Sequence, residues 1–120
     1  MSRIIVLILM HVYGDFFLQG NKLSKLKALN MPFLLEHVGI YTGVFLILSP
    51  MILGLTILQG IAFSLLNGST HLLIDSITGK YKLKYIETDE SKHITTVVID
   101  HTLHVNILIG SNMLLFPKAY

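Results

Sequence analysis

Residues 51–77 read MILGLTILQGIAFSLLNGSTHLLIDSI and are dominated by apolar side chains. Such a run is long enough to cross a bilayer as a helix, which takes roughly 17 to 25 residues. His71 and Asp75 lie inside it, although ionisable groups are costly in an apolar interior unless they pair, bind metal or line a polar cavity. Their placement therefore indicates a function. The polar residues 67–70 (NGST) predict a kink or break just before His71.

Pairs of the same kind recur in two other apolar stretches, and a single histidine lies in a fourth. Residues four apart lie one turn above each other on one face of a helix, so each pair can offer a nitrogen and an oxygen to a common point. One pair alone is equally consistent with a local hydrogen bond, and the whole set with buried polar packing between helices. The pattern gives seven candidate metal ligands: His11, Asp15, His37, His71, Asp75, Asp100 and His104.

The composition predicts a small membrane protein. Of its 120 residues, 52% are hydrophobic and 13% charged, with a mean hydropathy of +0.68. We expect one domain over residues 1–120 that is all-α, a four-helix transmembrane bundle. A tight turn is expected at Ser49 and Pro50. A signal peptide is the alternative for the first segment. The four predicted spans cover residues 4–18, 33–48, 51–77 and 94–116.

The distribution of basic residues predicts the orientation of these spans. The loops at 19–32 and 79–93 carry seven of the nine lysines and arginines, and Arg3 and Lys118 are the exceptions. The positive-inside rule therefore places both loops in the cytoplasm, with the two termini and the Ser49-Pro50 turn outside. With that topology, all seven ligand candidates fall in one layer of the cytoplasmic half of the bundle, at ~1.5 Å per residue along each helix.

The ligand types constrain the metal. The chain has no cysteine, so any metal must be held by nitrogen and oxygen. Imidazoles mixed with carboxylates suit zinc, manganese or iron better than calcium, and zinc is our first expectation. Seven candidates exceed the roughly four ligands of a closed zinc site, so the sequence predicts one or two divalent ions.

The predicted function is metal-dependent hydrolysis of a phosphoester or related bond on the cytoplasmic side, with a lipid head group or a phosphorylated small molecule as substrate. Glu36, beside His37, is a candidate general base or a carboxylate at the membrane interface. His101 lies about 100° around the helix from Asp100 and is a candidate catalytic or substrate-facing residue, or a spare polar group. We expect His93 to be a solvated loop residue. The flanking lysines Lys22, Lys25, Lys80 and Lys82 could attract an anion, although orientation alone explains them.

Two other classes of function remain open. A metal-ion or proton permease would also concentrate His and Asp inside a bundle, but it needs polar residues that continue to the outer face. A non-enzymatic membrane protein would use the cluster to fix helix packing. Nucleic-acid binding has little support, because the net charge is only +2 and no basic stripe is present. The bilayer is the expected partner, and no oligomeric state is predicted.

The stretch HVYGDFFLQ, residues 11–19, resembles the H-x-x-G-D-F-x-x-Q motif of a family of small bacterial and phage integral membrane proteins of unknown function. His37, the run HLLID at 71–75 and the run DHTLH at 100–104 are similar to the later motifs of that family. The resemblance covers nearly the whole chain and implies a bacterial inner-membrane protein with these residues as its ligands. His101 stands where the family usually has Gln, and Lys80 loosely matches a basic residue after the third motif.

A more distant similarity, in style, is to membrane-bound metal-dependent hydrolases with His/Asp motifs in their helices. Gln19 continues the face of His11 and Asp15, and it is a candidate amide partner for a ligand.

Overall fold

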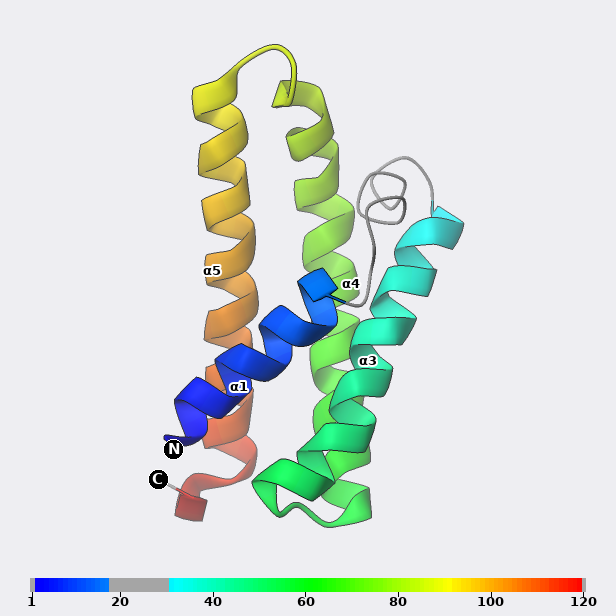
Figure 1. Cartoon of the computed structure of the whole chain (residues 1–120), viewed down its shortest axis with the longest axis vertical. Helices are drawn as coiled ribbons and strands as arrows, with labels where there is room; N and C mark the ends of the chain where they lie inside the picture. The colour runs from blue at the N-terminus through cyan, green and yellow to red at the C-terminus, as the bar shows by residue number, and fades with distance from the viewer. Residues whose placement is uncertain (1, 18–30, 120) are drawn as a thin grey trace.

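The computed structural model describes residues 2–17 and 31–119, which are helical almost throughout and contain no strand. The prediction of an all-α fold is therefore confirmed for this part of the chain. Figure 1 shows the arrangement of the elements. They are α1 (Arg3–Val12), the π-helical turn η1 (Tyr13–Phe17), α3 (Met31–Leu53), α4 (Ile57–Tyr85), α5 (Glu90–Leu115) and the short 3-10 helix η2 (Pro117–Ala119).

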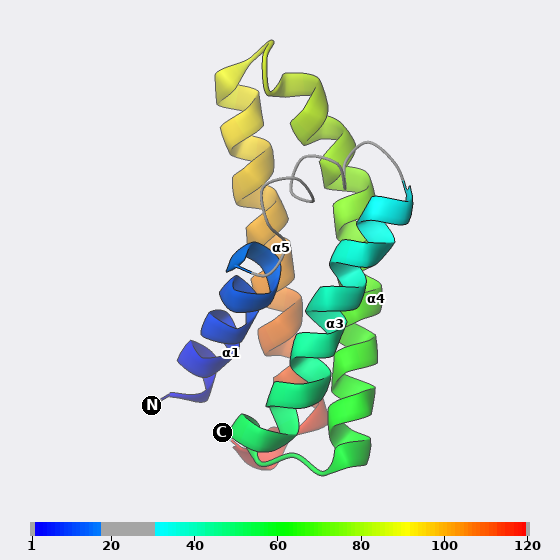
Figure 2. The same cartoon turned by 45° about the vertical axis from the view of Figure 1, so that its right-hand side comes forward.

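Helix α4 lies between α3 and α5 and packs along both of them. The shorter α1 runs obliquely to the long helices and contacts α3 on one side and α5 on the other (Figures 1 and 2). Its continuation η1 packs on α3. Both ends of the described chain lie toward the end of the bundle opposite the α4–α5 turn. Helix α1 thus closes the side of the bundle between α3 and α5.

The predicted turn at Ser49 and Pro50 is wrong, because α3 continues to Leu53. Pro50 lies inside the helix and has no backbone N–H to donate, yet the helix continues for three more residues. The Ser49 hydroxyl donates to the Phe45 carbonyl and satisfies an acceptor nearby. The helix ends at Gly54, whose φ of 69° lies in the left-handed region that glycine adopts easily. Thr56 then caps α4.

The predicted loop at 79–93 is also mostly helical. Helix α4 runs on to Tyr85, and α5 begins at Glu90. Lysine, leucine and tyrosine are adequate helix formers, so the polar composition that suggested a loop is compatible with exposed helix turns. Asp89 ends the connection by accepting a hydrogen bond from the Lys92 backbone N–H, which caps α5. His93 therefore lies in the first turn of α5, half-buried and with its Nδ1 3.1 Å from the Lys82 carbonyl oxygen.

No break occurs at residues 67–70, contrary to the prediction, because the polar side chains there are satisfied within the bundle. Asn67 Nδ2 donates to the Phe63 carbonyl and to Ser111 Oγ on α5. The hydroxyls of Ser69 and Thr70 donate to carbonyls one turn back. Gly68 lies directly against Thr42 of α3, where a Cβ would overlap the threonine hydroxyl. Gly68 therefore allows α3 and α4 to approach closely, and it does not kink α4.

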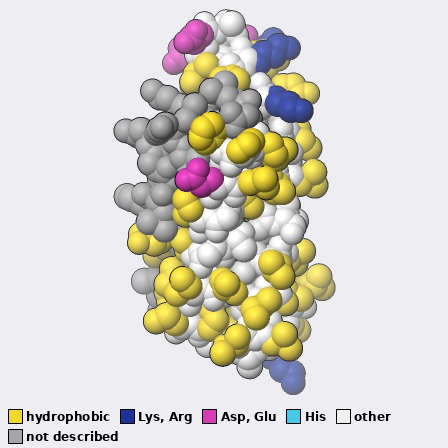
Figure 3. Space-filling view, turned by 90° about the vertical axis from the view of Figure 1, so that its right-hand side faces the viewer, with side chains coloured by type: hydrophobic (Ala, Val, Ile, Leu, Met, Phe, Trp, Pro, Cys, Tyr) yellow, Lys and Arg dark blue, Asp and Glu magenta, His cyan; other side chains and the backbone are white. Residues whose placement is uncertain are grey.

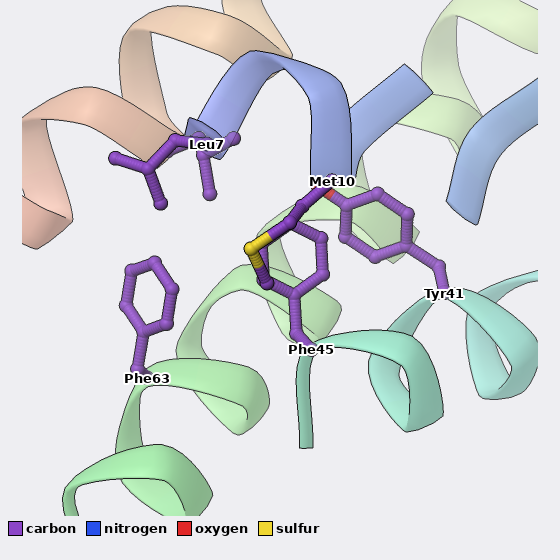
Figure 4. Packing of buried hydrophobic residues seen from close by; sticks show 6 residues of the cluster. Leu7, Met10, Tyr41, Phe45 and Phe63 are labelled. Carbon is purple, nitrogen blue, oxygen red and sulfur yellow. The ribbon is translucent and has the colours of Figure 1, made fainter. Parts of the chain in front are cut away.

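An apolar cluster fills the bundle on the side of the described termini. Its members come from all four helices, and Figure 4 shows five of them by name. Phe45 and Phe63 meet edge to face, with ring centroids 5.8 Å apart. The cluster consists of Leu7, Met10, Tyr41, Phe45, Phe63 and Leu108.

Among the described residues, α3 and α4 are the two helices long and apolar enough to cross a membrane. Helix α1 and its continuation η1, residues 3–17, are not among the helices that pass this test. The prediction of a helical bundle is thus confirmed for the described residues, and two of the four predicted spans correspond to helices that pass this test.

Arg3 links the ends of three helices. Its Nε donates to Asn112 Oδ1 of α5 at 2.8 Å, and its Nη1 donates to the Leu53 carbonyl of α3 at 3.1 Å. The guanidinium also lies over the Phe116 ring, 5.9 Å from its centroid. One of the two basic exceptions to the predicted orientation therefore has a structural role.

Candidate metal centre

The fold brings all seven predicted metal ligands together in the interior of the bundle. His11 comes from α1, Asp15 from η1 and His37 from α3. His71 and Asp75 come from α4, and Asp100 and His104 from α5. Every one of them is at most 5% exposed. Three carboxylates that are buried to this extent need cations or hydrogen bonds to compensate for their lost hydration.

Four of these residues form one compact group of donor atoms. His37 Nε2 lies 2.9 Å from Asp15 Oδ1 and 3.3 Å from Asp75 Oδ2. His71 Nε2 lies 3.5 Å and 3.3 Å from the same two oxygens. The two imidazole nitrogens are 2.9 Å apart. One nitrogen or oxygen from each residue lies within 4.8 Å of all the others, which is compatible with four ligands around one cation.

The other oxygens of the same two carboxylates face a second set of imidazoles. His11 Nε2 and His101 Nδ1 each lie 3.6 Å from Asp15 Oδ2. His104 Nε2 lies 3.4 Å from Asp75 Oδ1. Asp15 therefore stands between two groups of possible metal ligands, with one oxygen toward each group, and Asp75 has one oxygen toward the first group and the other toward His104. A carboxylate with its two oxygens placed in this way could be shared by two metal ions.

Two of the histidines are oriented by contacts on their outer nitrogens. His104 Nδ1 lies 2.8 Å from the Asp100 carbonyl oxygen, so it must carry the proton, and the lone pair is left on Nε2. His11 Nδ1 lies 3.1 Å from the Tyr41 hydroxyl. Both Nε2 atoms are buried without a hydrogen-bond partner. Metal-ligating histidines typically have one ring nitrogen hydrogen-bonded, as Nδ1 is in these two residues, and the other available to the metal, as Nε2 is here.

Tyr41 supports two of the ligands at once. Besides its contact with His11, its ring stacks on that of His71, with centroids 4.0 Å apart and planes 16° apart. Gly14 in η1 lies close by, and a Cβ there would meet Tyr41 Cδ2 at 3.3 Å. The π-helical turn thus sits tightly on α3 where it presents Asp15. Such turns within helices frequently occur at functional sites.

Asp100 differs from the other two carboxylates because a cation of the protein already neutralises it. Lys82 Nζ donates to its Oδ2 at 3.0 Å, and Thr78 Oγ1 donates to its Oδ1 at 2.5 Å. His101 Nε2 is 3.9 Å from the same Oδ2. Asp100, His101 and His104 also form a group that could hold a metal ion. His101 lies between Asp100 and Asp15, because its other ring nitrogen, Nδ1, faces Asp15.

The remaining predicted residues have different positions. Glu36 is exposed on α3, next to the buried His37. Gln19 lies outside the described residues. Tyr41 and Thr78 belong to the site although we did not predict them there, and Lys82, which we expected only as a flanking lysine that could attract an anion, contacts Asp100 directly. The spacing held a signal for two of them, because Thr78 and Lys82 continue the helical face of His71 and Asp75 at steps of three and four.

A family model described as a protein of unknown function, DUF3307, matches residues 4–118. The chain belongs to this family. The match includes every residue of the site, and it confirms the resemblance to a family of unknown function. No curated protein and no solved structure matches the chain. The chemistry of the family must therefore be argued from the arrangement of these side chains.

Proposed function

We propose that this protein is a membrane-embedded hydrolase that uses two divalent metal ions to cleave a phosphoester at the cytoplasmic side. The observation that carries the proposal is the position of Asp15 and Asp75, each with one oxygen toward His37 or His71 and the other toward a second set of histidines. Two divalent ions held by these residues would supply stabilisation of the attacking and the leaving oxygen in a displacement at phosphorus.

The charges of the site favour two ions and an anionic substrate. Three carboxylates and one lysine ammonium give the pocket of ligands a net charge of −2 when the histidines are neutral. Two divalent ions reverse this to +2, which a phosphate group can compensate. Histidines with carboxylates suit zinc, manganese or iron, and zinc remains our first expectation.

The chain's own residues have distinct tasks in the reaction. Asp15 and Asp75 would hold the ions at a fixed separation, and Tyr41 keeps the imidazoles of His11 and His71 in place. Water forms a new bond to phosphorus while the ester P–O bond breaks, and the leaving oxygen takes up a proton. His101 is the imidazole of the site with exposed surface, so it is placed to pass the proton of the reacting water to solvent. Glu36 has no task in this proposal.

The surface supports a membrane location. The outward faces of all four helices carry large apolar side chains, and Ile57, Leu58 and Leu114 are each more than three-quarters exposed. In Figure 3, hydrophobic side chains spread over the face shown, and most of its charged side chains lie toward the upper end. The molecule is 46 Å long, more than the ~30 Å of a hydrocarbon core, so the α4–α5 turn would project into the cytoplasm.

Neither a permease nor a packing cluster fits the site as well. The apolar cluster lies next to the ligands along every helix, on the side away from the α4–α5 turn, where a permease needs a polar route. A packing cluster would satisfy its own polar atoms, yet His11 Nε2 and His104 Nε2 are buried without hydrogen-bond partners. An unsatisfied buried group costs about 1–3 kcal/mol, which metal binding would offset.

Hydrolysis can be tested on protein purified in detergent and loaded with zinc or manganese. We expect release of phosphate from a soluble aryl phosphate or from phospholipid vesicles, abolished by a chelator and restored by the metal. His71→Ala removes a ligand and should lower turnover by at least about 100-fold. His93→Ala, outside the ligand groups, is the matched control and should retain turnover. A metal-loaded wild type that hydrolyses neither substrate would contradict the proposed reaction.

A further inference from the structure

Two side chains of the site, those of Lys82 and His101, are less buried than the others, and we call their side the edge of the site. The side chains of Asp15, Asp75, Asp100 and the four buried histidines are at most 3% exposed. The side chain of Lys82 is 19% exposed and that of His101 is 28% exposed. Both contact Asp100, from α4 and α5 respectively. A substrate that reaches the buried ligands by the most exposed part of the site therefore passes the Lys82 ammonium.

The lysine is held by one carboxylate alone among the described groups. Lys82 Nζ binds Asp100 Oδ2, while Thr78 occupies the other oxygen of Asp100. Asp100 also belongs to a possible metal-ligand group with His101 and His104. A metal ion drawn to that group would compete with the ammonium for Asp100, because both are cations. Metal loading would thus weaken the ion pair between Asp100 and Lys82 and make the ammonium available to an anion.

We infer that Lys82 is the residue that binds the phosphate group of the substrate and presents it to the metal ions. This inference rests on the proposed function, because it needs a metal-loaded site. A lysine ammonium is a point charge that binds phosphate oxygens without fixing their orientation, which leaves the metal ions to orient the phosphorus for attack. The phosphate can come from a lipid head group or from a soluble ester, and the chemistry recognised at Lys82 is the same.

Neighbouring lysines are less suited to this task. Lys84 is exposed, and its ammonium lies over the Tyr85 ring, 5.3 Å from the centroid. Lys80 is also exposed. On a helix, both point well away from Lys82, because two residues correspond to about 200° of rotation. Lys84→Met therefore serves as a control that removes the same charge from the same helix without touching the site.

The test measures metal content and phosphate binding on the same preparations of wild type, Lys82→Met, Lys82→Arg and Lys84→Met. Inorganic phosphate is titrated into metal-loaded protein in detergent, and vesicles containing phosphatidic acid serve as the membrane probe. We expect Lys82→Met to retain its metal and to bind phosphate at least about tenfold more weakly. Lys82→Arg and Lys84→Met should stay within about twofold of wild type.

The outcomes separate the two proposals and the two sources of phosphate. Weaker binding of both probes assigns Lys82 to the phosphate group itself, and weaker binding of vesicles alone assigns it to a lipid head group. Unchanged binding in Lys82→Met, an equal loss in Lys84→Met, or loss of metal from Lys82→Met overturns the role of Lys82 and leaves the proposed function standing. A wild type that binds no metal overturns both.

Discussion

Replacing Asp75 with asparagine is expected to lower the affinity for divalent metal by at least about 100-fold, more than the 10- to 100-fold loss that follows removal of an outer partner of a ligand. Asp75 faces His37 and His71 with one oxygen and His104 with the other. An amide keeps the shape but removes the charge and one of the two ligand oxygens. Asp15→Asn should have the same effect, because Asp15 also faces a histidine with each of its oxygens, His37 with Oδ1 and His11 with Oδ2.

Glu36→Gln is the matched control for these two variants. It removes a carboxylate from the residue next to His37, but Glu36 is exposed and lies outside the groups of possible metal ligands. Its metal affinity should equal that of wild type in the same calorimetric titration. If Asp75→Asn and Glu36→Gln bind metal alike, Asp75 is not a ligand and the bridging arrangement has no chemical role.

Labelling of single cysteines in intact cells should divide the chain into two sides. The sequence has no native cysteine, so Ser2→Cys and Ser91→Cys each introduce one reactive group. Both serines are exposed, and they lie toward opposite ends of the bundle. We expect a membrane-impermeant thiol reagent to label position 2 readily and position 91 only after lysis, because basic residues favour the cytoplasm.

The same experiment distinguishes the possible numbers of spans. If only α3 and α4 cross the membrane, positions 2 and 91 lie on the same side and both resist the reagent. Labelling of position 91 but not of position 2 means that the orientation is opposite to the prediction. Lysed cells provide the control for reactivity, since both cysteines must then react.

The ligands were predictable because their signal is local. His11 with Asp15, His71 with Asp75 and Asp100 with His104 are each four residues apart, so helical geometry alone puts each pair on one face. Which faces meet depends on packing between helices. The contact of Lys82 with Asp100 joins α4 to α5 across a four-residue connection, and the sequence placed that stretch of α4 in a loop.

The sequence predicted wrongly where α3 ends and that α4 breaks at residues 67–70. Pro50 predicts the end of a helix, yet α3 continues past it to Leu53, and Gly54, which adopts a positive φ at no steric cost, follows its last residue. Residues 67–70 suggested a break because their side chains can bond to the backbone. In the bundle they make those bonds without leaving the helix, and Gly68 is used for contact with Thr42.

The metal content of the wild-type protein tests the central claim most directly. The protein is purified in detergent without chelator, incubated with zinc or manganese, freed of unbound metal and measured by elemental analysis. The two-sided arrangement of Asp15 and Asp75 predicts about two ions per chain. A protein that retains no metal under these conditions, with no gain in thermal stability when zinc or manganese is added, would contradict the account.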